Sequence, residues 1–100
     1  MIKYNVIPSD EFVCEVENHL RFLAKVSVPA SRKLGSLFVK ALSNLSTSAE
    51  AYALFYNQYR KIVVANRYAI FYSVIGKNVY VDRIFDMRAG EYNDIILDNE

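Results

Sequence analysis

The chain has 100 residues, of which 53% are hydrophobic, with only three glycines and two prolines. This length and composition predict one compact domain over residues 1–100 and exclude a disordered chain. Twelve lysines and arginines oppose eleven aspartates and glutamates, and the net charge of +1 does not by itself indicate a nucleic-acid-binding protein.

The apolar stretches, the N-terminal residues and the single cysteine predict where the protein is located and whether it binds a metal or cofactor. No stretch approaches the roughly 18–20 apolar residues of a membrane span, so we expect no membrane partner. The first residues do not resemble a signal peptide, and a single cysteine, Cys14, cannot form an internal disulfide, so we expect a cytoplasmic protein. Cys14 has no cysteine or histidine at metal-ligand spacing, and we expect neither a metal nor a cofactor.

The first half of the chain predicts a strand followed by two helices. Residues 2–7 alternate apolar and polar side chains, as in a strand, and Ser9 or Asp10 then caps a helix. An apolar stripe through Phe12 and Val16 includes His19, which we interpret as a half-buried structural histidine. Pro29 interrupts this helix and starts a second one. The second helix has the most regular apolar stripe of the chain, which comprises Leu34, Leu37, Phe38, Ala41, Leu42 and Leu45.

Two segments of this half leave alternatives open. Gly35 in the second helix either permits close approach of the first helix or is a tolerated surface glycine. Residues 47–50 (TSAE) fit a capping box, which predicts a short third helix to about Phe55. A loop that carries Tyr52, Phe55 and Tyr56 onto the core is the alternative.

Residues 59–88 predict three antiparallel strands joined by two turns. Runs of β-branched and aromatic residues are typical of strands, with a turn at Asn66 and a second at Gly76 and Lys77 of type II′. Six cations oppose two carboxylates in this segment, a net charge of +4, whereas the residues after Arg88 carry −4. A cationic, aromatic-rich sheet is a plausible surface for a polyanion or an acidic partner. Residues 91–97 predict a last short strand or a helical turn.

These elements predict an α+β fold: an N-terminal strand, a two-helix hairpin and an antiparallel sheet of three to four strands. We expect the hairpin to cover one sheet face, the first strand to join the sheet, and the other face to be partly open. The order, together with the YRKIVV, RYAIFY, VYV and IFDMR segments, resembles the RelE/ParE toxin superfamily. The resemblance covers essentially the whole chain.

The resemblance implies the toxin of a bacterial type II toxin–antitoxin module, of the plasmid-stabilisation type, held inactive in a hetero-oligomer with a cognate antitoxin. Some members of the superfamily are mRNA interferases, which cleave mRNA in the ribosomal A site, and ParE-like members inhibit DNA gyrase. The first hypothesis is a ribosome-dependent mRNA endonuclease. The alternatives are a non-enzymatic gyrase inhibitor and a decayed toxin that retains only antitoxin binding. The antitoxin would lie along the sheet edge or the helix hairpin.

The same resemblance implies candidate site residues. Cleavage by the RNA's own 2′-hydroxyl needs cations near the phosphate and a group that moves protons. The catalytic candidates are Arg60, Arg88 and Tyr92, and the RNA-phosphate-binding candidates are Lys61, Arg67 and Arg83.

Two expectations qualify this set. Because strand residues alternate between faces, Arg60 and Lys61 cannot line one cleft. Asp86 would repel a phosphate unless it pairs with Arg88, and Arg83 alternatively pairs with Asp82 or Asp86.

Overall fold

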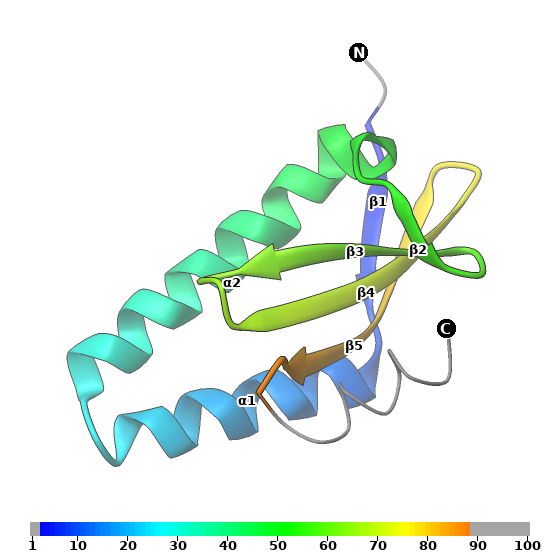
Figure 1. Ribbon diagram of the computed structural model, residues 1–100. Coiled ribbons are helices and arrows are strands. Elements are labelled where there is room, and N and C mark those ends of the chain that lie inside the picture. The colour runs from blue at the N-terminus through cyan, green and yellow to red at the C-terminus, as the bar shows by residue number, and fades with distance from the viewer. Residues whose placement is uncertain (1–2, 89–100) are drawn as a thin grey trace.

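The computed structural model describes residues 3–88, which form an α+β fold in which a helical hairpin packs on a five-stranded sheet (Figure 1). The order of strand, two helices and sheet confirms the prediction. The elements are β1 (Asn5–Pro8), α1 (Asp10–Ala24), α2 (Val28–Ser48), a 3₁₀ turn η1 (Ala49–Ala51), β2 (Leu54–Tyr56), β3 (Tyr59–Val64), β4 (Tyr68–Ile75) and β5 (Asn78–Asp86).

Both helices begin at serine caps. The Ser9 hydroxyl accepts a hydrogen bond from the Phe12 amide at 3.0 Å, and Asp10 and Glu11 lie in the first turn of α1. The Ser27 hydroxyl accepts from the Ala30 amide at 3.2 Å, with Pro29 in the first turn of α2. Side-chain caps satisfy amides that the helix itself leaves unpaired, which explains why both helices start where they do.

The secondary structure after α2 differs from both alternatives predicted for this region, although Tyr52 and Phe55 pack against apolar clusters as the loop alternative expected. The helix continues through Ser48 into η1, and residues 54–56 form β2 rather than a third helix or a loop. The Thr47 hydroxyl donates back to the Asn44 carbonyl at 3.4 Å instead of capping a new helix. Leu45 and Ala49 are fully buried, and the Tyr72 hydroxyl donates to the Ala49 carbonyl at 2.7 Å. Core packing therefore extends the helix past the local cap signal.

The sheet has the strand order β1-β5-β4-β3-β2. β1 pairs with β5 in parallel, from Asn5 opposite Asn78 to Pro8 opposite Val81, and the other pairs are antiparallel. β1 ends at Pro8, one residue later than predicted, because a proline at a sheet edge removes no ladder hydrogen bond. The strand also begins later than predicted, because Lys3 and Tyr4 precede β1. Ile2, the predicted first residue, and residues 91–97 lie outside the described residues.

The two predicted turns are confirmed. Ile75 pairs with Asn78 around Gly76, whose φ is +61°, which fits glycine at the first central position of a tight hairpin. Ala65 and Asn66 have φ of +56° and +53°, and the Arg67 amide donates to the Val64 carbonyl at 3.2 Å.

The main core lies between the helical hairpin and one sheet face. It includes Tyr4, just before β1, and buried residues of both helices and of three strands: Phe12, Leu34, Phe38, Ala41, Leu45, Ile62, Val64, Tyr68, Ile70, Tyr72, Val79, Val81 and Ile84. His19 is half-buried beside it, with its ring 5.1 Å from that of Tyr68. Leu20 lies opposite Gly35, where an added Cβ would sit 3.6 Å from Leu20 Cδ1, an ordinary contact. The helices therefore do not require glycine for close approach.

The opposite face of the sheet carries a second apolar cluster. Ala69, Phe71 and Phe85 are buried there, and Phe55, Tyr59 and Met87 pack against them. The face that we expected to be partly open is therefore covered at these three positions. Within residues 3–88, no helix is long and apolar enough to cross a membrane.

Candidate functional site

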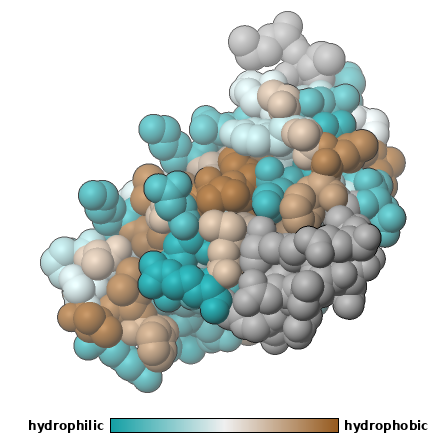
Figure 2. Space-filling model, viewed as in Figure 1, coloured by the Kyte–Doolittle hydropathy of each residue, from teal (hydrophilic) through white to brown (hydrophobic). Residues whose placement is uncertain are grey.

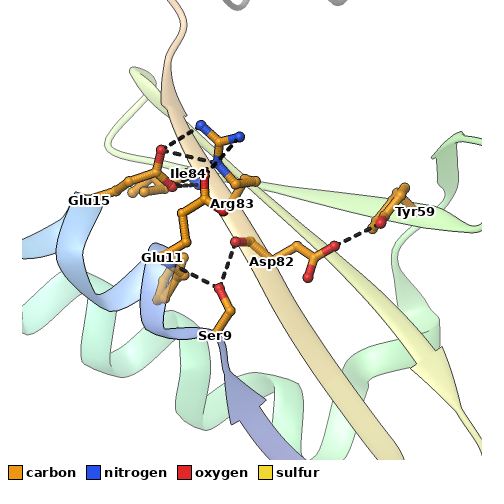
Figure 3. A network of polar contacts seen from close by, with 8 residues as sticks. Ser9, Glu11, Glu15, Tyr59, Asp82, Arg83 and Ile84 are labelled. Carbon is orange, nitrogen blue, oxygen red and sulfur yellow. Dashed lines mark hydrogen bonds and ion pairs between the residues drawn. The ribbon is translucent and has the colours of Figure 1, made fainter.

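Residues at the start of α1 provide hydrogen-bond partners for the part of β5 that does not pair with β1. β1 accompanies β5 only as far as Val81, so the next backbone groups of β5 need other partners. The Ser9 hydroxyl donates to the Asp82 carbonyl at 2.9 Å, and Glu15 Oε1 accepts from the Ile84 amide at 3.3 Å (Figure 3). A helix cap and a helix carboxylate thus complete this sheet edge.

Arg83 is held by two carboxylates of α1. Its Nε and Nη2 donate to the Glu15 carboxylate at 3.0 and 2.8 Å, and its Nη1 lies 3.2 Å from Glu11 Oε1 (Figure 3). The guanidinium carbon also lies 4.8 Å from the centre of the Phe85 ring. Arg83 pairs with Glu15 and Glu11, so the expected alternative, a pair with Asp82 or Asp86, is wrong.

Asp82 instead binds a tyrosine of β3. The Tyr59 hydroxyl donates to Asp82 Oδ2 at 2.7 Å, and this hydrogen bond, with partial burial, raises the pKa of Tyr59. The β4–β5 register shifts here, with Phe71 opposite Arg83 but Tyr72 opposite Val81, which leaves Asp82 as the extra residue. The irregularity allows the consecutive residues Asp82 and Arg83 to bind partners in β3 and α1.

Arg67 and Asp86 form a second ion pair at the far end of β4 and β5. Arg67 Nη2 and Nε donate to Asp86 Oδ2 at 2.7 and 3.0 Å, and the Arg88 amide donates to Oδ1 at 3.0 Å. Burial alone would raise the pKa of Asp86, but the hydrogen bonds from Arg67 and Arg88 and their charges lower it below its usual value. The cation that pairs with Asp86 is therefore the Arg67 side chain, whereas Arg88 contributes its main-chain amide.

Arg60 and Lys61 lie on opposite faces of the sheet, as the alternation predicts. Arg60 shares the core side with Ile62 and donates to the Tyr52 and Glu50 carbonyls, the latter at 3.5 Å. Lys61 Nζ lies on the other face, 4.1 Å from the centre of the Phe55 ring.

The structure brings two of the predicted cations into one row. Lys61 pairs with Phe71 across β3 and β4, and Phe71 pairs with Arg83 across β4 and β5. Directly opposed residues project to the same face, so Lys61, Phe71 and Arg83 form a row that we call the outer row. Arg60 lies on the opposite face, and Arg67 lies near the end of the sheet that carries Asp86.

The two remaining candidates are Arg88 and Tyr92, of which only Arg88 belongs to the described residues. Arg88 is exposed just after β5. Tyr92 lies outside the described residues, so its role stays a prediction.

The acidic partners of Arg83 were missed in the sequence. Glu11 and Glu15 are spaced i, i+4 on α1, which places them on one helix face, and this spacing was the available signal. Their partner in β5 is 68 residues away from Glu15, and no local pattern connects the two segments.

Three grooves formed by residues 3–88 lie beside α2. The largest, about 720 Å³, runs between α1 and α2 and is lined mainly by apolar side chains, including the exposed Val13 and Val39. A second of about 560 Å³ separates α2 from β1, and a third of about 290 Å³ separates α2 from β3. No group of three or more His, Cys, Asp or Glu side chains suited to a metal ion occurs among residues 3–88.

Comparison with protein-family models and with curated protein sequences gives no match. A solved structure described as "Chromosomal ParDE TA system from P. aeruginosa" contains a chain with a similar fold, with a TM-score of 0.74 and 13% sequence identity. The alignment covers 86% of this protein and 98% of that chain. At this identity the similarity establishes the α+β fold, including the N-terminal strand, the helical hairpin and the antiparallel sheet.

Proposed function

We propose that this protein is the toxin component of a type II toxin–antitoxin module in the cytoplasm. The support is the fold shared with a chain of a ParDE toxin–antitoxin system over 98% of that chain, together with the resemblance of residues 59–88 to the RelE/ParE superfamily. The antitoxin is the expected partner, in a hetero-oligomer with the toxin. The groove between α1 and α2 supports this partner, because burying the exposed Val13 and Val39 would favour association.

Of the two actions open to such a toxin, we favour inhibition of DNA gyrase by binding. The observation behind this choice is that Arg83, Arg67 and Arg60 already donate to protein oxygens. To contact a phosphate in place of these partners, each guanidinium would have to leave a charge-assisted or carbonyl hydrogen bond, which costs free energy. A toxin that inhibits gyrase by surface binding does not need these arginines to leave their protein partners.

Ribosome-dependent mRNA cleavage is the second candidate. The exposed Arg88 and the Lys61 side chain of the outer row favour it. In that mechanism Arg88 would stabilise charge on the phosphate, and Tyr92 would assist proton transfer.

Two assays on the purified protein separate these actions. We expect the protein to reduce supercoiling of relaxed plasmid by gyrase and to leave mRNA uncut on translating ribosomes, as read by primer extension. Cuts within codons that disappear in Arg88→Ala, with supercoiling unaffected, would replace the first candidate by the second. A folded protein that is inactive in both assays would support a decayed toxin.

A further inference from the structure

The apex of the helical hairpin, residues 21–33, exposes large apolar side chains to water. It joins α1 to α2 and extends past the ends of β3 and β4 (Figure 1). Phe22, Val26 and Val28 are 70%, 79% and 48% exposed. Figure 2 shows brown and tan residues beside teal ones over this apex, at the lower left of the molecule. Neighbouring exposed apolar side chains of this size mark an interaction surface.

The apex itself carries positive charge and no carboxylate, and Glu17 lies just outside it, one helical turn before Arg21. From Asn18 to Ala49 the chain has five lysines and arginines and no aspartate or glutamate. Four of these cations, all exposed, belong to the apex: Arg21, Lys25, Arg32 and Lys33. None of them takes part in the ion pairs found within residues 3–88, whereas Arg67 and Arg83 of the sheet are paired with carboxylates. The apex therefore carries four cations that form no ion pair within residues 3–88.

The combination of apolar and cationic side chains limits the classes of partner that the apex can bind. A peptide segment docks in a groove or on a strand edge, and none of the three grooves beside α2 is lined by Phe22, Val26 or Val28. A nucleic acid would engage the cations through its phosphates but would leave the two valines in water. An anionic bilayer accepts both, since apolar side chains enter the boundary between headgroups and acyl chains while cations contact the lipid phosphates.

We propose that the hairpin apex binds the surface of anionic phospholipid membranes, with Phe22 and Val26 entering the interface. The expectation of no membrane partner depended on the lack of a spanning segment, and surface binding requires none. This proposal stands apart from the proposed toxin function, because it depends on neither an antitoxin nor a cellular target.

Vesicle flotation with a matched control tests the proposal. Vesicles of equal parts phosphatidylglycerol and phosphatidylcholine should carry the full-length protein, and vesicles of phosphatidylcholine alone should carry much less. The double variant Phe22→Ser/Lys25→Gln should lower partitioning roughly tenfold or more. The control Ile75→Ser/Lys77→Gln makes the same kind of change at the β4–β5 turn, where Ile75 is 64% exposed, and should partition like the wild type. Thermal unfolding of both variants verifies that each remains folded.

A polarity-sensitive dye reports whether the apex itself enters the membrane. Cys14 is exposed and is the chain's single cysteine, so Cys14→Ser provides a background for Val26→Cys or Ile75→Cys. The emission should shift to the blue with anionic vesicles for the dye at position 26 and stay constant at position 75. No flotation, equal losses in both double variants, or binding only to RNA or DNA would each overturn the proposal.

Discussion

The Arg83 guanidinium donates three hydrogen bonds to the Glu15 carboxylate, at 3.0, 3.1 and 2.8 Å, across the junction of β5 and α1. Glu15 also accepts the Ile84 amide, so one carboxylate compensates a charge and completes a sheet edge. Arg83, a candidate for binding phosphate in the sequence, therefore has a structural role in the fold.

Removing this carboxylate should destabilise the protein. In Glu15→Ala, Arg83 loses its best partner and the Ile84 amide loses its acceptor, which should lower the free energy of unfolding by about 1–2 kcal/mol. Glu17→Ala is the matched control, because Glu17 is exposed on the same helix, and it should change stability by less than about 0.5 kcal/mol. Urea unfolding measures both. Equal effects of the two substitutions would mean that Glu15 has no special structural role.

The Arg67–Asp86 pair should make stability depend on acidic pH. Because the pKa of Asp86 is lowered in the folded state, its contribution is present above the unfolded pKa of about 3.9 and is lost as pH falls through the folded value. Asp86→Asn and Arg67→Gln should each flatten the fall in unfolding free energy on acidification. Unfolding curves at a series of pH values test this, and a slope that neither substitution changes would contradict it.

Tyr72 should make the protein sensitive to alkaline pH. Burial raises the pKa of its hydroxyl to about 12, and the hydroxyl donates to the Ala49 carbonyl. A raised folded pKa gives stability that is complete below the unfolded pKa of about 10 and is lost as pH rises toward 12. Tyr72→Phe should lower stability by about 1 kcal/mol at neutral pH and reduce the alkaline loss. If the variant loses stability as steeply as the wild type above pH 10, another group is responsible.

Gly35→Ala should stabilise the protein. An added Cβ would make an ordinary contact with Leu20, and alanine favours a helix over glycine by about 1 kcal/mol. Gly76→Ala is the contrasting change, because Gly76 has a φ of +61°, where a side chain is strained by about 1–2 kcal/mol. Thermal unfolding should therefore move in opposite directions for the two variants. A lower melting temperature for Gly35→Ala would show that the helices need the glycine after all.

Local patterns predicted most of the fold and little of the site. The Ser9 cap, the apolar stripes and the turns at Asn66 and Gly76 act over a few residues, and the structure confirms them. β2 was missed because it has only three residues and an irregular register with β3, so its formation depends on the tertiary structure. The ion pairs of Arg83 join segments almost seventy residues apart, which periodicity cannot reveal.

Viable counts after tightly regulated expression in a bacterial host test the proposal that this chain is a toxin restrained by an antitoxin. Cultures that produce the chain should stop forming colonies, and cultures carrying the same gene with a stop codon at Tyr4 should grow normally. Co-expression of the cognate antitoxin should restore growth. Unimpaired growth while the folded chain accumulates without the antitoxin would contradict the proposal.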